Sequence, residues 1–386
     1  MAPYVLFCGL TMAVSWGIRG QFGHERGAMI PGVTCALAIA LVSIDDAKRT
    51  RLAALGVAGG LGMAVGGVMS YGSLVEMLLE PSTFWRGLAG LAAKGAIWGG
   101  IAGGALGMAL SETRYRWRNL LWLLPLLAFW HITGNTPSLD GLSEGDMSVT
   151  LAATLALFLL WLYAVPRDTS AAFMAMCGLV GFGVGMPFGY WLFAVCRGAG
   201  LMDWWKVAEV VWGFCGGAAL GLGVYCLDEA RTSPPHSPWR APTWLGLIYI
   251  AWLVPLANAL NVLTYWTLEK EVLGPWALAL YGVGALVLLV GLATLFECWP
   301  NRLSPRRTAA LLFVWVGLVT FAAQFLKMRF PNTITGPHVC TQIVLGLGVA
   351  GLCAWALWLG LWSLKARDGA IVERDHGRLP SEGAET

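Results

Sequence analysis

The chain has 386 residues, of which 57% are hydrophobic and 12% are charged. Soluble globular domains contain about 45–50% apolar and about 25% charged residues, so this composition excludes an ordinary soluble domain. The formal net charge of +3 does not indicate a nucleic-acid partner. Nine cysteines without a Cys-x-x-Cys pair indicate neither a disulfide framework nor a zinc site.

Apolar runs of nearly 20 residues recur along the chain and predict an all-α, polytopic transmembrane helical bundle of about twelve spans. The first run has no basic region before it and no small-residue cleavage site after it, so we expect it to remain as a span rather than to be a signal peptide. The candidate spans are residues 4–20, 27–47, 54–79, 87–111, 119–134, 147–165, 171–196, 206–227, 243–266, 275–297, 308–327 and 338–364.

Lysine and arginine residues are unequally divided between alternate connections. One set of connections, together with the C-terminal tail, carries 16 of them, whereas the other set carries 8. The positive-inside rule places the first set in the cytoplasm. We therefore expect both termini to be cytoplasmic, in a plasma membrane or a bacterial inner membrane.

A proline-rich connection at residues 233–242 is expected to be a stiff linker that divides the chain. Before it lies a glycine-rich portion with eight spans, residues 1–232, and after it a portion with four spans, residues 243–364. The charged residues 365–386 contain few apolar side chains and predict a disordered cytoplasmic tail.

Two glycine-rich stretches of the N-terminal portion resemble each other. Their matching positions, offset by 114 residues, are Trp98, Gly99, Gly103 and Gly107 in the first stretch and Trp212, Gly213, Gly217 and Gly221 in the second. Glycines spaced by four share a helical face and offer a smooth surface to a neighbouring helix. The match indicates a parallel internal repeat, in which spans three and four correspond to spans seven and eight.

Both proposed repeats contain poor helix formers at corresponding places, residues 56–67 and residues 181–189, and the second includes Gly185 and Pro187. Interrupted spans at matching positions are typical of a transporter's substrate site, because unwound backbone at membrane depth lines a cavity or is covered by protein. The alternative is that these glycines only allow close packing of continuous helices.

Residues 16–27 hold the densest group of polar side chains, with Arg19, His24, Glu25 and Arg26 in a glycine-punctuated turn. Guanidinium groups and backbone N–H groups in such a turn bind anionic groups well. The alternative is an interfacial loop whose charges pair with each other or with lipid phosphates.

Two further charges lie within predicted spans, Glu76 in span three and Lys94 in span four. Because a charge inside the membrane costs about 2.5–3.5 kcal/mol on the insertion scale, we expect the two to pair across the hairpin or to have access to water. A structural ion pair and a cation site or proton relay are both consistent with this placement.

His131 ends span five on the same predicted outer side as His24. A histidine side chain exchanges protons near neutral pH, so both residues are candidates for proton transfer. An interfacial role is the alternative for His131. Asp203, Lys206 and Glu209, near the start of span eight, are interpreted as interfacial anchors.

These features favour a secondary transporter of a small polar or anionic solute, with its site between the interrupted spans three and seven. The candidate substrate-binding residues are Arg19, His24, Glu25, Arg26, Glu76, Lys94, His131, Gly185 and Pro187. The expected partners are the lipid bilayer and the solute, with coupling to protons or sodium left open. No catalytic residue, metal or cofactor is expected.

The alternative is a membrane-embedded transferase acting on a lipid-linked or acyl substrate at the outer face. His24 or His131 would then be the general base, and the arginines would hold a phosphate. A non-catalytic membrane scaffold is the third hypothesis.

Overall fold

A computed structural model describes residues 1–23, 25–44, 51–67, 71–111, 113, 115, 144–230, 243–269, 274, 276–298, 304–329 and 336–376. Throughout these ranges every regular element is a helix, which confirms the predicted all-α class. The predicted span 119–134 and the whole of the predicted linker 233–242 lie outside the described residues.

The N-terminal portion is built from α1 (Ala2–Arg19), α2 (Glu25–Val42), α4 (Leu52–Gly66), α5 (Gly72–Leu79), α6 (Phe84–Leu110), α9 (Glu144–Ala164), α10 (Thr169–Cys196) and α11 (Trp204–Glu229). In the C-terminal portion, α12 (Thr243–Ile248) and α13 (Val254–Thr264) are joined by a π-helical turn, Tyr249–Leu253, and a second π-helical turn, Tyr265–Glu269, follows. It ends with α14 (Trp276–Cys298), α15 (Pro305–Arg329) and α16 (Gly336–His376).

Several of these helices are long and apolar enough to span a membrane. Within the described ranges there are five such segments: Thr169–Ala199, Trp204–Glu229, Trp244–Leu268, Pro305–Lys327 and His338–Leu361. The count of twelve spans is not confirmed. One reason is that α2 and α4 have only 18 and 15 residues, short of the roughly 20 apolar residues of a typical span.

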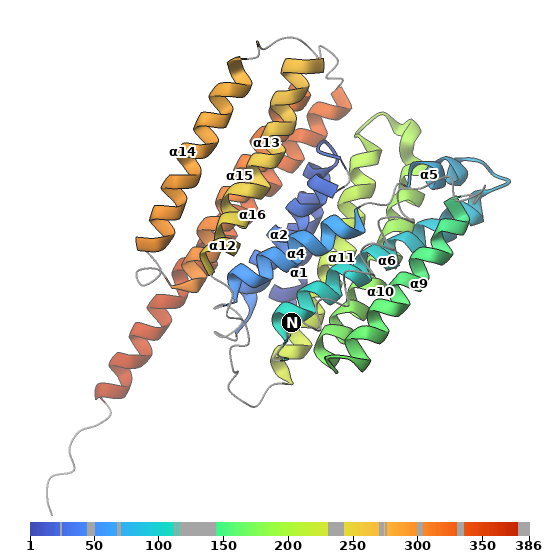
Figure 1. Ribbon diagram of the computed structural model, residues 1–386. Coiled ribbons are helices and arrows are strands. Elements are labelled where there is room, and N and C mark those ends of the chain that lie inside the picture. Colours follow the sequence, from blue (N-terminus) through green and yellow to red (C-terminus); the bar gives the residue numbers. More distant parts are fainter. Residues whose placement is uncertain are drawn as a thin grey trace, which may run out of the picture.

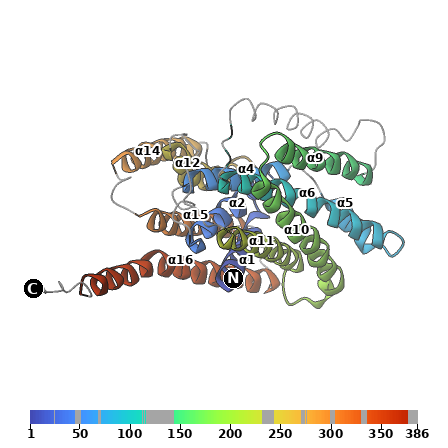
Figure 2. The same cartoon turned by 90° about the horizontal axis from the view of Figure 1, so that it is seen from below.

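Six helices of the N-terminal portion form a closed ring, in which α1, α11, α10, α6, α4 and α2 each contact the next and α2 returns to α1. Figures 1 and 2 show α12, α14 and α15 on one side of this ring and α5 and α9 on the opposite side. Figure 1 also shows the N-terminus and the last turns of α16 at the same end of the helices.

Helix α2 joins the two portions of the chain. Every residue from 27 to 43 except Met29 is buried, so α2 has no face left for solvent or lipid. It contacts α1, α4 and α11 of the ring and also α13, α15 and α16 of the C-terminal portion. The C-terminal helices therefore pack directly against a helix of the ring.

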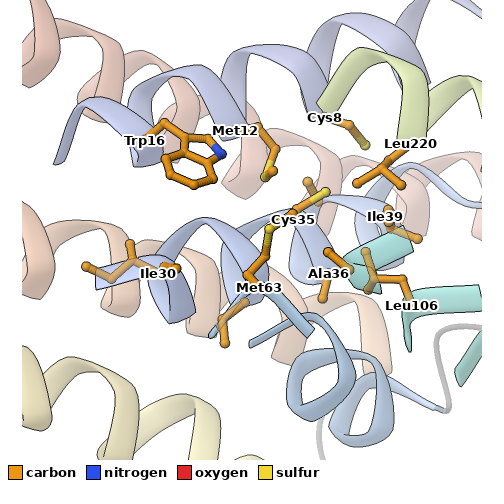
Figure 3. Close-up of a cluster of buried hydrophobic side chains, with 14 of the residues drawn as sticks. Cys8, Met12, Trp16, Ile30, Cys35, Ala36, Ile39, Met63, Leu106 and Leu220 are labelled. Atoms are coloured by element: carbon orange, nitrogen blue, oxygen red, sulfur yellow. The ribbon is translucent and has the colours of Figure 1, made fainter. Parts of the chain in front are cut away.

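The interior between α1 and α2 is filled by small and flexible apolar side chains. Figure 3 shows Cys8, Met12 and Trp16 of α1 facing Cys35 and Ile39 of α2, and all of them are fully buried. Thioether and thiol side chains adapt to irregular gaps between closely spaced helices. Trp16 ends this row of side chains and begins the polar region described below.

Glycines bring the ring helices into backbone contact. A Cβ atom added to Gly99 of α6 would lie 2.1 Å from the carbonyl oxygen of Gly178 in α10. One added to Gly32 of α2 would lie 2.1 Å from the carbonyl oxygen of Gly59 in α4. Since no side chain fits in these places, the glycine stripes of the sequence are close helix–helix contacts, as their spacing predicts.

The predicted third span is two helices, because α4 ends at Gly66 and α5 begins at Gly72. Residues 56–66, where we expected the interruption, are helical, and the break follows them. The break brings Tyr71, the residue before α5, to a buried position inside the ring.

The interruption predicted in span seven is wrong. Helix α10 is continuous from Thr169 to Cys196, with Pro187 inside it. Gly185 and Gly189 lie against α11, where an added Cβ would meet Cys215 Cβ at 2.6 Å and the carbonyl oxygen of Ala208 at 2.5 Å. Tertiary packing on this face outweighs the poor helix propensity of the segment. The internal repeat itself stays a prediction.

Candidate functional site

Three tryptophans meet at the centre of the helical ring. Trp16 of α1, Trp98 of α6 and Trp212 of α11 are each fully buried. The rings of Trp16 and Trp212 stack with their centroids 4.1 Å apart, and Trp98 meets each of them edge-on at 5.1 Å. A cluster of this kind presents a rigid surface that excludes water from the side chains packed against it.

The sequence carries a signal for this cluster that extends beyond the two glycine-rich stretches. Each of the three tryptophans is followed by a glycine, and these are all the Trp-Gly pairs in the chain. The glycines bring the three tryptophans together because they allow their helices to approach closely. Gly99 lies against α10, and an added Cβ on Gly213 of α11 would lie 2.6 Å from the carbonyl oxygen of Met12 in α1.

Arg19, the last residue of α1, lies within this cluster and is 1% exposed. Its guanidinium carbon lies 4.3 Å from the centroid of the Trp16 ring, 5.4 Å from that of Trp98 and 5.8 Å from that of Trp212. Its Nη2 also donates a hydrogen bond of 2.8 Å to the hydroxyl of Tyr71. Cation–π attraction and this hydrogen bond hold a full charge inside the bundle.

Glu209 balances Arg19 and a second buried cation, Lys206. Lys206 Nζ donates a hydrogen bond of 2.8 Å to Glu209 Oε2, and Arg19 Nη2 lies 3.7 Å from Glu209 Oε1. Both residues of α11 are almost completely buried, so the prediction that they are interfacial anchors is wrong. The reason is that the first turns of α11 pack against α10 and α1, where a Cβ added to Gly189 or Gly17 would meet Ala208 or Val210.

Tyr71, Tyr190 and Trp205 form a second aromatic layer beside the charged group. The Tyr71 ring centroid lies 5.5 Å from that of Tyr190 and 6.2 Å from that of Trp205. Tyr71 comes from the break between α4 and α5, so the interruption of the third span supplies a direct contact to Arg19.

Several buried N–H groups of this region have no hydrogen-bond partner: Arg19 Nε, Trp16 Nε1 and Trp212 Nε1. The third indole is satisfied, because Trp98 Nε1 donates a hydrogen bond of 2.8 Å to the carbonyl oxygen of Met63. An unpaired buried donor costs about 1–3 kcal/mol, so three of them in one cluster call for an acceptor.

Comparison with known proteins adds no assignment at this point. No family model, curated protein or solved structure matches the chain. In the part of the chain that the structure describes, no group of three or more His, Cys, Asp or Glu residues is arranged to hold a metal ion.

Of the candidate residues from the sequence, Arg19 lies at the centre of this site. Lys94 is buried in α6, four residues before Trp98 and therefore on the same helical face. Glu76 is exposed on α5, away from the buried Lys94, so the ion pair, one of the two arrangements expected for these charges, does not form. Leu74 and Leu78 occupy the side of α5 that faces α6, so Glu76 lies on the other side.

The remaining candidates are not gathered here. Arg26 is exposed on α2, and Gly185 and Pro187 belong to the continuous helix α10. His24 and His131 lie outside the described residues. Glu25 begins α2, and the structure does not describe its side chain.

A second polar contact connects the C-terminal helices to the turn after Arg19. Lys327 Nζ of α15 donates hydrogen bonds to the carbonyl oxygen of Gln21 at 2.6 Å and to Asn261 Oδ1 of α13 at 2.8 Å. It also lies 5.3 Å from the centroid of the Tyr265 ring. A movement of α13 or α15 would therefore act on the segment that carries Arg19.

A different buried carboxylate lies at the opposite end of α11. Asp228 Oδ2 accepts hydrogen bonds from the Tyr4 hydroxyl at 2.6 Å and from Ser43 Oγ at 2.9 Å. These bonds join the start of α1, the end of α2 and the end of α11. Asp228 is consequently a structural carboxylate and a matched comparison for Glu209.

Gly20 separates the charged group from the exterior. The residue is exposed, yet a Cβ atom on it would lie 2.2 Å from Lys206 Nζ and 2.6 Å from Glu209 Oε2. The α-helical backbone angles of Gly20 suit any residue, so its importance comes from this close approach.

The Gly20→Ala substitution is expected to displace the Lys206 and Glu209 side chains while costing at most about 1 kcal/mol of stability, because their ends are flexible. Under the transporter hypothesis drawn from the sequence, solute uptake should fall severalfold at nearly unchanged Tm. The control is Gly72→Ala, since nothing lies within 4 Å of an added Cβ there. Equal uptake by the two variants would contradict this role for Gly20.

Proposed function

We propose that this chain is a membrane-embedded secondary transporter of a small polar or anionic solute. In the proposal, Arg19, Lys206 and Glu209 form the centre of the binding site. The supporting observation is their burial as a connected charged group inside a bundle of apolar helices. Ionisable groups in such a place are costly and are typical of substrate and ion pathways.

The broken third span supports the same proposal. Transporters commonly bind solutes where a helix is discontinuous, because freed backbone and helix ends there contact the solute. Here Tyr71 lies at the break between α4 and α5 and accepts a hydrogen bond from Arg19. The site of the proposal therefore lies among α1, α6, α11 and this break, rather than between spans three and seven.

The proposed setting is a plasma or bacterial inner membrane, crossed by about twelve spans with both termini in the cytoplasm. Five helical segments of the described ranges have the required length and apolar character. The N-terminus and the end of α16 lie at one end of the helices, in agreement with termini on one side of a membrane (Figure 1).

Uptake into proteoliposomes tests the proposal directly. The purified full-length protein would be reconstituted and offered radiolabelled carboxylates, phosphate esters, amino acids and sugars under imposed proton or sodium gradients. We expect accumulation of at least one solute, which an ionophore abolishes and which empty liposomes do not show. Absence of uptake across the panel by correctly folded protein, under both gradients, would refute transport.

A further inference from the structure

We infer that the site binds an anion that presents at least two oxygen acceptors, a carboxylate or phosphate group, and that Glu209 competes with this anion for Arg19 and Lys206. The inference rests on the proposed function, because it names the solute class of the same site. It adds an internal competitor, which the transport proposal does not require.

The unpaired polar atoms of the aromatic cluster favour an acceptor. Arg19 Nε, Trp16 Nε1 and Trp212 Nε1 are donors without any accepting capacity, and their residues are at most 1% exposed. A ligand rich in oxygen acceptors satisfies such groups, whereas a ligand made only of donors leaves them unpaired.

The geometry around Arg19 leaves the Nε–H group of the guanidinium for such a ligand. Nη2 is bonded to Tyr71, and its 3.7 Å separation from Glu209 Oε1 is too long for a hydrogen bond. Nε has no partner. Carboxylates and phosphates characteristically bind arginine through two adjacent N–H groups. On Arg19 the edge that carries Nε also carries Nη2, so a bound anion would take the unpaired Nε–H and share Nη2 with the Tyr71 hydroxyl.

Glu209 occupies the position of a competing anion. Its carboxylate is hydrogen-bonded to Lys206 and close to Arg19, so two cations share one negative charge. A second anion can be attracted by both cations only if it weakens their electrostatic attraction to Glu209. Removal of the Glu209 charge should therefore strengthen anion binding.

The aromatic rings argue against a cationic ligand. Cages of tryptophan and tyrosine bind cations in many proteins, but here the Arg19 guanidinium already lies over Trp16 at 4.3 Å and near Trp98 at 5.4 Å. A cationic solute would have to displace a charge of the chain itself. The site therefore favours anionic over cationic ligands.

The test measures binding without transport. Full-length protein in a neutral detergent is titrated with acetate or inorganic phosphate by calorimetry, and Tm is recorded in parallel. Sodium chloride and tetramethylammonium chloride at equal ionic strength are the comparison salts. We expect acetate or phosphate to raise Tm and to give a saturable heat of binding, and both chlorides to have little effect.

The Glu209→Gln variant tests the competition. Without added oxyanion its Tm should be below that of the wild type, because two buried cations lose their counter-ion. Its oxyanion affinity should rise about tenfold or more, as expected for loss of a close competing charge. Asp228→Asn is the matched control, since it removes a buried, hydrogen-bonded carboxylate from the other end of α11 and should leave the affinity unchanged.

Should Glu209→Gln fail to fold, Glu209→Asp provides the same comparison. Its shorter side chain keeps the charge but withdraws it from Lys206 and Arg19, so a smaller rise in oxyanion affinity is expected. Unchanged or weaker oxyanion binding by the folded variant overturns the proposed competition.

Two further comparisons separate the sources of the anion and the two proposals. Phosphatidylglycerol in the micelles tests a lipid headgroup, and inorganic phosphate tests a free anion; saturable binding of either supports the inference. Oxyanion binding without uptake in proteoliposomes supports the inference and overturns transport. Uptake of neutral or cationic solutes without any oxyanion effect supports transport and overturns the inference.

Discussion

Replacing Arg19 by methionine is expected to abolish solute uptake and to lower the free energy of unfolding by about 3 kcal/mol. Methionine fills a similar volume but leaves Tyr71 without its donor and removes the cation from the faces of Trp16, Trp98 and Trp212. Glu209 keeps Lys206 as its partner, so the variant should still fold. Uptake is measured per amount of monodisperse, reconstituted protein.

A second buried arginine provides the control for Arg19. Arg51 is 4% exposed and donates hydrogen bonds to the carbonyl oxygens of Leu110 and Ser111 at the end of α6. The Arg51→Met variant should lose a comparable amount of stability while the folded fraction keeps its uptake. The role given to Arg19 fails if its variant transports as well as the Arg51 variant does.

Replacing Gly99 by leucine is expected to prevent assembly of the helical ring. An added Cβ would lie 2.1 Å from the carbonyl oxygen of Gly178 and 2.7 Å from Phe182 Cβ. The first of these atoms belongs to the backbone of a long helix, so only separation of α6 from α10 relieves the clash. We expect a loss of more than about 3 kcal/mol, at the upper end of overpacking effects.

Size-exclusion chromatography of the detergent-solubilised protein measures this loss as disappearance of the monodisperse peak. Gly351→Leu makes the same change in α16, where nothing lies within 4 Å of an added Cβ, and should leave the peak intact. A monodisperse Gly99→Leu protein with wild-type Tm would show that the described contact between α6 and α10 is not tight.

The helical class and the close helix contacts could be predicted because both depend on local patterns. Apolar runs indicate helices by length and composition, and the spacing of glycines by four shows which face of a helix permits close approach. The burial of Trp98 and Trp212 agrees with their place inside apolar runs. None of these inferences requires knowledge of which helices are neighbours.

The membership of the site could not be predicted in the same way, because it depends on contacts between distant segments. Lys206 and Glu209 stand near a helix start, where charged residues are commonly exposed, and only the packing of α11 against α1 buries them beside Arg19. Depth in the membrane alone predicts a pair between Glu76 and Lys94, but the orientation of α5 turns Glu76 outward. Pro187 suggested a break that the contacts of α10 suppress.

The enclosure of α2 has a consequence for biogenesis. Its neighbours α1 and α4 are adjacent in the chain, whereas α13, α15 and α16 are synthesised much later, α15 beginning only at Pro305. During synthesis in the proposed membrane, one flank of the second helix must therefore stay in contact with lipid or with an insertion factor until the last helices arrive. Ribosome-bound chains truncated before α13 should accordingly be more sensitive to proteolysis and crosslink to lipid through α2, a step that completed chains no longer show.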